Sequence, residues 1–172
     1  MATIITQDAN LAWSGVRLAL LKERCQAMFE QLARVAGVQG ACVCDNHGVI
    51  LGLLLAGVGD RRLFERIGLG LSQCLGALHA RSAVIDLEVV FERKTVVARD
   101  LGNATLAVVC SADANLPLLR MTLNVAANPF EGDAELQRGL KQAALSRANT
   151  LSGEHLDALA RSLLQRAGVR AA

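Results

Sequence analysis

Polar and apolar side chains alternate most regularly in the middle of the chain. Residues 83–92 place apolar side chains at odd positions and carboxylates between them: Ile85, Leu87, Val89 and Phe91, against Asp86 and Glu88. This period of two predicts a β-strand with one apolar face. Residues 95–101, β-branched at their start, and residues 104–110 predict two further strands. Gly102 and Asn103 form a two-residue loop between them, which is typical of an antiparallel hairpin.

Three segments show the spacing of an amphipathic helix. They cover residues 14–36, residues 61–80 and a stretch from residue 116 that follows the N-cap residue Asn115. The pair Asn128-Pro129 is expected to end the third helix. The first helix has a narrow apolar stripe, formed by Leu18, Leu21, Cys25, Met28, Leu32 and Val35. Such a stripe suits packing on a sheet, and its spacing also suits a coiled-coil seam with a second copy.

Two apolar strands are expected between the first two helices. They cover residues 40–45 and residues 49–56, and the turn-forming sequence Asp45-Asn-His-Gly48 joins them. The second strand has no polar side, so helices are expected on both faces of its sheet.

The predicted helix over residues 61–80 contains three glycines, Gly68, Gly70 and Gly76. Each of them costs about 1 kcal/mol relative to alanine in a helix interior. Close approach of another backbone along this helix would compensate for that cost, and a weakly selected helix is the alternative.

The two ends of the chain differ from its middle. We assign residues 1–13 to a flexible N-terminal segment, residues 14–128 to the folded domain and residues 129–172 to a C-terminal helical extension. The extension contains a helix over residues 134–148 and a better-patterned one that begins at Ser152. The apolar stripe of the latter consists of Leu156, Leu159, Ala160, Leu163 and Ala167. The extension is either packed structure or a partner-binding arm.

Composition narrows the classes of function. The chain is 52% hydrophobic but only 3% aromatic, and its net charge of +2 comes from interspersed charges of both signs. A basic stripe is lacking, which argues against a nucleic-acid partner. The N-terminus lacks the pattern of a signal peptide, and the longest apolar run is too short to cross a bilayer. We therefore expect a cytoplasmic protein without membrane insertion, whose five cysteines are reduced.

No sequence motif points to catalysis, and we expect no enzyme activity, cofactor or metal. A phosphate-binding P-loop motif is absent. Cys42 and Cys44 are two residues apart, which is the wrong spacing for a zinc knuckle or a redox pair. His47, His79 and His155 form no spacing motif and are interpreted as ordinary surface histidines.

The order and spacing of these elements resemble the Roadblock / dynein light chain family. Three short pieces carry the resemblance: Val35-Ala-Gly-Val-Gln-Gly-Ala41 with the turn that follows, Val96-Val-Ala-Arg-Asp-Leu-Gly-Asn103, and Ala114-Asn-Leu-Pro-Leu-Leu-Arg120. The resemblance implies an α/β (α+β) sandwich of the profilin-like kind. Its five-stranded, mostly antiparallel sheet would have one helix on one face and two on the other.

The resemblance also implies a homodimer. Family members pair through the second helix and the strand after it, which are residues 61–80 and 83–92 here. An apolar strand edge also needs a partner on physical grounds. The interface residues carried over to this chain are Leu63, Ile67, Leu71, Cys74, Leu78, Val84, Asp86, Glu88 and Val90.

The function implied by the family is that of a non-catalytic adaptor or regulator of a small Ras-like GTPase. Polar residues on the second helix are candidates for the GTPase contact: Arg61, Arg62, Glu65 and Arg66. A solvated helix face is the simpler interpretation of these four residues. Two other functions stay open, namely a small-molecule-sensing module and an assembly protein that recruits a larger complex through its C-terminal helices.

Overall fold

A computed structural model describes residues 3–6, 15–55, 61–79, 82 and 84–145 of the chain. The elements follow in the order β1 (Thr3–Thr6), α1 (Gly15–Leu32), β2 (Val38–Asp45), β3 (Ile50–Leu55), α2 (Arg61–His79), β4 (Asp86–Val90), β5 (Lys94–Asp100), β6 (Ala104–Ser111) and α3 (Leu116–Glu131). A further helix covers residues 134–145. Within the described ranges, no helix has the length and apolar character needed to span a membrane.

The strands form one six-stranded sheet in the order β1-β3-β2-β6-β5-β4, and every neighbouring pair is antiparallel. The five strands expected from the sequence are all present. Gly102, with φ +89°, allows the tight turn between β5 and β6 that its sequence predicts. The sheet ends at β4, whose outer edge meets no other strand among the described residues.

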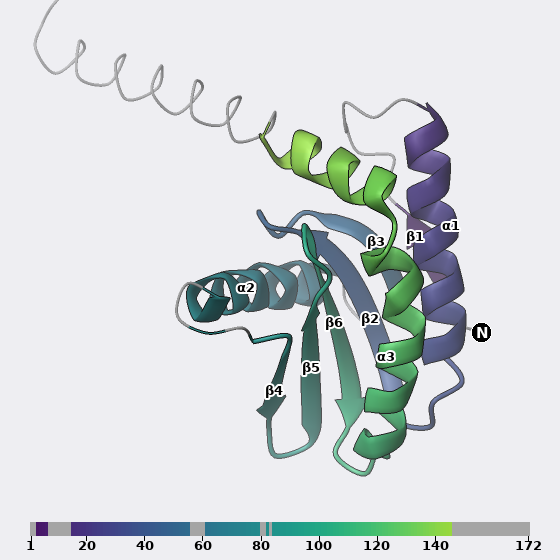
Figure 1. Cartoon of the computed structure of the whole chain (residues 1–172). Helices are drawn as coiled ribbons and strands as arrows, with labels where there is room; N and C mark the ends of the chain where they lie inside the picture. The colour runs from purple at the N-terminus through teal and green to yellow at the C-terminus, as the bar shows by residue number, and fades with distance from the viewer. Residues whose placement is uncertain (1–2, 7–14, 56–60, 80–81, 83, 146–172) are drawn as a thin grey trace, which may run out of the picture.

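Helices cover both faces of the sheet, as Figure 1 shows. Helices α1 and α3 and the helix over residues 134–145 lie on one face, where Phe29, Leu123 and Phe130 belong to a single buried cluster. Helix α2 lies alone on the other face, where Phe64 and Leu75 belong to a second cluster. The predicted arrangement of one helix on one face and two on the other is therefore confirmed for α2, α1 and α3, and the helix over residues 134–145 adds to the face of α1 and α3. The stripe of α1 packs inside its own chain, in agreement with the sheet-packing interpretation.

Two parts of the chain differ from the sequence expectation. Residues 1–13 carried no strand signal, yet Thr3–Thr6 pair with β3 over Gly52–Leu55, because an edge strand needs only one partner. Helix α3 does not end at Asn128-Pro129 but continues to Glu131. Proline is tolerated here because it stands in the last turn, where the amide lost and the carbonyl exposed both lie near solvent.

The beginning of the C-terminal extension is packed structure. Leu136 and Leu140 are each 1% exposed and belong to the same cluster as α1 and α3. Gln137 also binds this helix to the sheet, because its side-chain amide nitrogen donates a hydrogen bond to the carbonyl oxygen of Leu101 at 2.7 Å. The folded core thus continues beyond residue 128, and residues 146–172, with the second predicted helix, lie outside the described residues.

Candidate functional site: the groove between α2 and the β4–β5 hairpin

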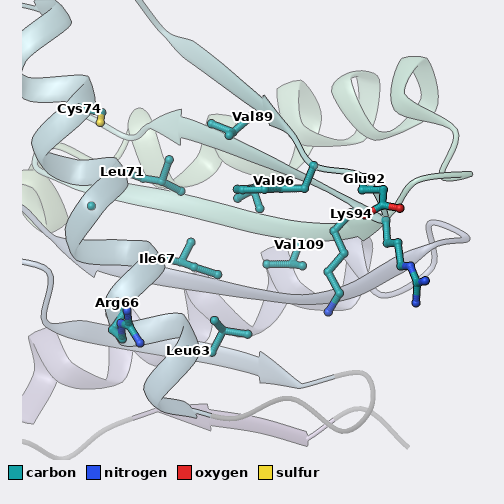
Figure 2. A pocket seen from close by; sticks show the side chains of 13 residues that line it. Leu63, Arg66, Ile67, Leu71, Cys74, Val89, Glu92, Lys94, Val96 and Val109 are labelled. Carbon is teal, nitrogen blue, oxygen red and sulfur yellow. The ribbon is translucent and has the colours of Figure 1, made fainter.

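An apolar groove of about 710 Å³ lies beside α2, on the face of the sheet that α2 covers only in part. Its apolar lining comes from the helix and from three adjacent strands: Leu63, Ile67, Leu71, Cys74, Val89, Phe91, Val96 and Val109. Figure 2 shows the helix residues along one side and the valines across the floor.

The floor of the groove follows directly from strand register. Val89 on β4 is paired with Val96 on β5, which in turn is paired with Val109 on β6. Paired residues on adjacent antiparallel strands point to the same face, so the three valines form a continuous row. The sequence signal for this row is the alternation of residues 83–92, which puts Val89 on the apolar side of its strand.

Charged side chains border the groove at the turn of the β4–β5 hairpin. Glu92, Arg93 and Lys94 belong to that turn, and Arg66 extends from α2. Cations outnumber carboxylates among these four residues. An apolar partner with acidic side chains at its edge would therefore complement the groove.

The helix residues expected at a dimer interface are distributed along the groove. Leu63 is 44% exposed and Leu78 is 37% exposed, whereas Leu71 is 8% exposed and packs on the sheet below. Ile67 is half-buried and Cys74 is exposed. Four of the five expected helix residues, Leu63, Ile67, Leu71 and Cys74, form one wall of the groove. The fifth, Leu78, lies one turn beyond Cys74.

The expected interface residues of β4 have other neighbours. The carboxylate of Asp86 lies 3.9 Å from the guanidinium of Arg99 on β5, and the carboxylate of Glu88 pairs with Arg120 on α3. Asp86 and Glu88 therefore have ion-pair partners within their own chain. Val84 packs against the cluster below α2, and Val90 is 70% exposed beside the open edge of the sheet.

Sequence reasoning missed the β4 residues that actually line the groove. It named the even-numbered positions of the strand, whereas the groove is lined by the odd-numbered Val89 and Phe91. The alternation had already separated these two faces. Val89 and Phe91 could have been identified if the side of the sheet that α2 covers had been known. That side follows only from the topology of the folded chain.

The three glycines of α2 have different surroundings. A Cβ on Gly68 would lie 3.1 Å from Sγ of Cys44, so this glycine allows α2 to approach its own sheet closely. A Cβ on Gly70 or Gly76 would meet nothing within 4 Å in the described structure. Gly68 is therefore explained by packing within the chain, and the other two face open space.

The residues expected to contact a GTPase all lie on α2, where Arg62 and Arg66 are exposed and Arg61 and Glu65 are half-buried. Arg61 donates from its Nε to the Glu65 carboxylate at 3.0 Å, an i, i+4 ion pair of the kind common on exposed helices. Arg62 is exposed, and Arg66 borders the groove. The four residues share one helix but do not converge on a single point.

The thiols and imidazoles have ordinary structural roles. Burial raises the pKa of Cys25 to about 12 and that of Cys44 to about 11, which keeps both thiols protonated. His47 bonds the carbonyl oxygen of Ala144 at 3.3 Å, and His79 pairs with the Asp100 carboxylate at 2.9 Å. In the described ranges, no group of three or more potential metal ligands exists.

Comparisons with known proteins relate the fold to solved structures. No family model matches the chain, and no curated protein matches it. The gliding protein MglB of Thermus thermophilus is similar with a TM-score of 0.55 and 19% identity, over 80% of this chain and 100% of that one.

Two other solved structures are similar to a comparable degree. The Roadblock/LC7 domain from Streptomyces avermitilis has a TM-score of 0.52 and 16% identity, over 60% of this chain and 91% of that chain. MglB of Myxococcus xanthus has a TM-score of 0.52 and 13% identity, over 67% and 95%. At such low identity these likenesses establish architecture, and the chain has the Roadblock/LC7 fold.

Proposed function

We propose that the protein is a non-catalytic homodimeric regulator of a small Ras-like GTPase, and that it pairs through α2 and β4. The observation that carries this proposal is an apolar groove next to an open strand edge. Exposed apolar surface and unpaired edges both favour association with another chain. Pairing of two β4 edges would extend the sheet across both copies.

Side-chain exposure along α2 and β4 supports the dimer. Leu63, Phe91 and Val90 are 44%, 56% and 70% exposed. Burying a large apolar side chain fully contributes about 1.5–3 kcal/mol, so several such residues on α2 and at the edge of β4 offer enough for stable association. Gly70 and Gly76 leave room for a second helix to approach α2.

The GTPase part of the proposal comes from the Roadblock family, whose sequence motifs this chain resembles and whose members regulate such switches. Arg66 is the most suitable contact among the four candidates, because it extends from α2 at the border of the groove. A dimer that binds one nucleotide state more tightly than the other would shift the GTPase toward that state, by no more than the difference in affinity.

The dimer is tested by comparing Leu63→Asp with Met121→Asp in sedimentation equilibrium. Met121 is 68% exposed on α3, on the opposite side of the sheet, and serves as the matched control. A carboxylate at Leu63 should weaken association by about 3 kcal/mol, or about a hundredfold in Kd. Equal dimer dissociation constants for the two variants would refute pairing through α2.

Binding to the GTPase is tested with small GTPases of the same organism, loaded with GDP or a non-hydrolysable GTP analogue. State-dependent binding that Arg66→Glu abolishes would support the proposal, and the rate of hydrolysis in the same samples would show which step is regulated. A folded dimer that binds neither state would contradict it.

A small-molecule sensor is the second candidate, and the volume of the groove favours it. Ligand sites in proteins usually measure about 300–1,000 Å³ and are mostly apolar, as this groove is. Native mass spectrometry of the purified protein separates the two functions. A bound apolar compound that is released by Ile67→Asp would assign the groove to a ligand instead of a second copy.

A further inference from the structure

The groove beside α2 needs a cover whenever the protein is not paired with a second copy. At low concentration a dimer dissociates, and the exposed apolar residues of the groove, Leu63 (44% exposed) and Phe91 (56% exposed), would then face water. A segment of the same chain can cover such a surface at any concentration, because its local concentration is fixed by the linker. The chain contains one such segment.

The described part of the chain ends close to α2. The carbonyl oxygen of Ala144 lies 3.3 Å from Nε2 of His47, in the turn between β2 and β3. The same turn touches α2, since a Cβ on Gly48 would lie 2.7 Å from the Cα of Leu69. Residues 146–151 can extend about 20 Å, which exceeds the width of a helix.

The sequence after Ser152 matches the groove in length. Its apolar stripe extends from Leu156 to Ala167, and the helix wall of the groove extends from Leu63 to Cys74. With a rise of about 1.5 Å per residue, each of these spans is about 16 Å long. A helix formed by residues 152–168 would therefore present its stripe along the whole groove.

The first turns of this segment carry charge opposite to that of the groove border, and Arg161 and Arg166 follow later in the segment. Its first turns carry Glu154 and Asp157, whereas Arg66, Arg93 and Lys94 border the groove. Acidic residues near a helix N-terminus also stabilise the helix itself.

We propose that residues 152–168 dock as an amphipathic helix in the α2–β4 groove of their own chain and compete there with the second copy. This inference rests on the proposed function, because it treats the groove as the dimer surface. The segment would act as an internal competitor that sets the concentration at which the dimer forms. Any partner that captures the segment would thereby promote pairing.

Cys74 provides the readout, because it is exposed and lines the groove, whereas the other four cysteines are buried. The experiment measures the alkylation rate of Cys74 in the full-length protein over a wide range of protein concentration. Leu159→Asp with Leu163→Asp disrupts the stripe. Ala158→Asp with Gln165→Asp adds the same charge to the opposite helix face and serves as the control.

The proposal predicts that Cys74 in the wild-type protein is protected at high dilution. The stripe variant should react about tenfold faster there, as expected for a segment docked about nine-tenths of the time, and the control should not. The stripe variant should also dimerise at lower concentration. Equal rates for both variants at high dilution would overturn the proposal.

The concentration dependence separates this proposal from the dimer itself. Protection that appears only at high concentration and is the same in both variants would support the dimer and refute internal docking. Protection at high concentration that only the stripe variant loses would mean that the segment docks on a neighbouring copy, which also overturns the proposal as stated. A rate that is the same in the wild type and in both variants at every concentration would refute both.

Discussion

Replacement of Gly68 by alanine is the sharpest test of how α2 is seated on the sheet. An alanine Cβ at this position would lie 3.1 Å from Sγ of Cys44, 3.4 Å from its Cβ and 3.7 Å from Sγ of Cys42. The Cys44 thiol cannot easily retreat, because it lies 3.3 Å from Oγ of Ser72 and 3.5 Å from the carbonyl oxygen of Thr105. The added methyl therefore requires a shift of the helix or of β2.

The size of the effect follows from two opposing contributions. Replacing glycine by alanine in a helix stabilises it by about 1 kcal/mol, and overpacking a filled site costs about 1–3 kcal/mol. Gly76→Ala is the matched control, because its methyl would enter open space and only the favourable contribution remains. Gly68→Ala should therefore be less stable than Gly76→Ala by about 1–3 kcal/mol.

Urea denaturation measures this difference in free energy of unfolding, at a protein concentration where both variants are monomeric. In a thermal scan it corresponds to a gap of roughly 2–12 °C in Tm for a chain of this size. Combining Gly68→Ala with Cys44→Ala should remove part of the cost, since the two residues are in contact. If Gly68→Ala were as stable as Gly76→Ala, the account of this glycine would be wrong.

Three further predictions concern charges and thiols. Arg99 is 9% exposed and pairs with the carboxylates of Glu131 at 2.9 Å and Asp86 at 3.9 Å. Because both carboxylates are partly exposed, Arg99→Met should cost about 1.5–3 kcal/mol in urea denaturation. The exposed Arg120→Met, which breaks the pair with Glu88, should cost less than about 1 kcal/mol. The backbone amide of Leu136 and the guanidinium of Arg24 hold the pKa of Asp133 below its ordinary value of 3.8. The folded state therefore favours the ionised form, and the stability that this carboxylate contributes is present above pH 3.8 and is lost as the pH falls through the lowered pKa. The difference in free energy of unfolding between the wild type and Asp133→Asn should therefore shrink on acidification. A difference that is independent of pH would contradict this prediction. Finally, prolonged alkylation of the native protein should modify Cys74 before any other cysteine, because burial raises the pKa of Cys110 and Cys44 to about 11. Mass spectrometry detects the order of labelling, and early labelling of Cys42 or Cys25 would show that the sheet opens easily.

The order of strands and helices could be predicted from the sequence because each element carries a local signal. The alternation in residues 83–92 and the loop at Gly102 are examples, and both correspond to elements of the structure. Thr3–Thr6 carries no such signal, since four residues are too few for a pattern and the strand depends on its pairing with β3. Pro129 misled the prediction because its position within the helix, not its identity, determines its effect.

The candidate site could be predicted only in part. The stripe of α2 identified one wall of the groove, because helix periodicity shows which residues share a face. The floor combines β4 with β5 and β6, and its row of valines exists only when strand register is known. The same limit applies to Gly68, whose close neighbours on β2 are distant in sequence. Local patterns specify faces, and tertiary pairing decides which faces meet.

The contacts on the two faces of β4 would allow this strand to pair with a second copy while it keeps its packing within its own chain. Its even-numbered carboxylates are fixed by cations of the same chain, Asp86 by Arg99 and Glu88 by Arg120. Its odd-numbered residue Val89 belongs to the floor of the groove. Only the backbone along its outer edge is left for a new strand, and backbone pairing needs no rearrangement of either face. A second copy would therefore pair with a strand whose two faces are already packed within its own chain. Competition between residues 152–168 and the second copy would change the occupant of the groove, and the edge of β4 would keep its position.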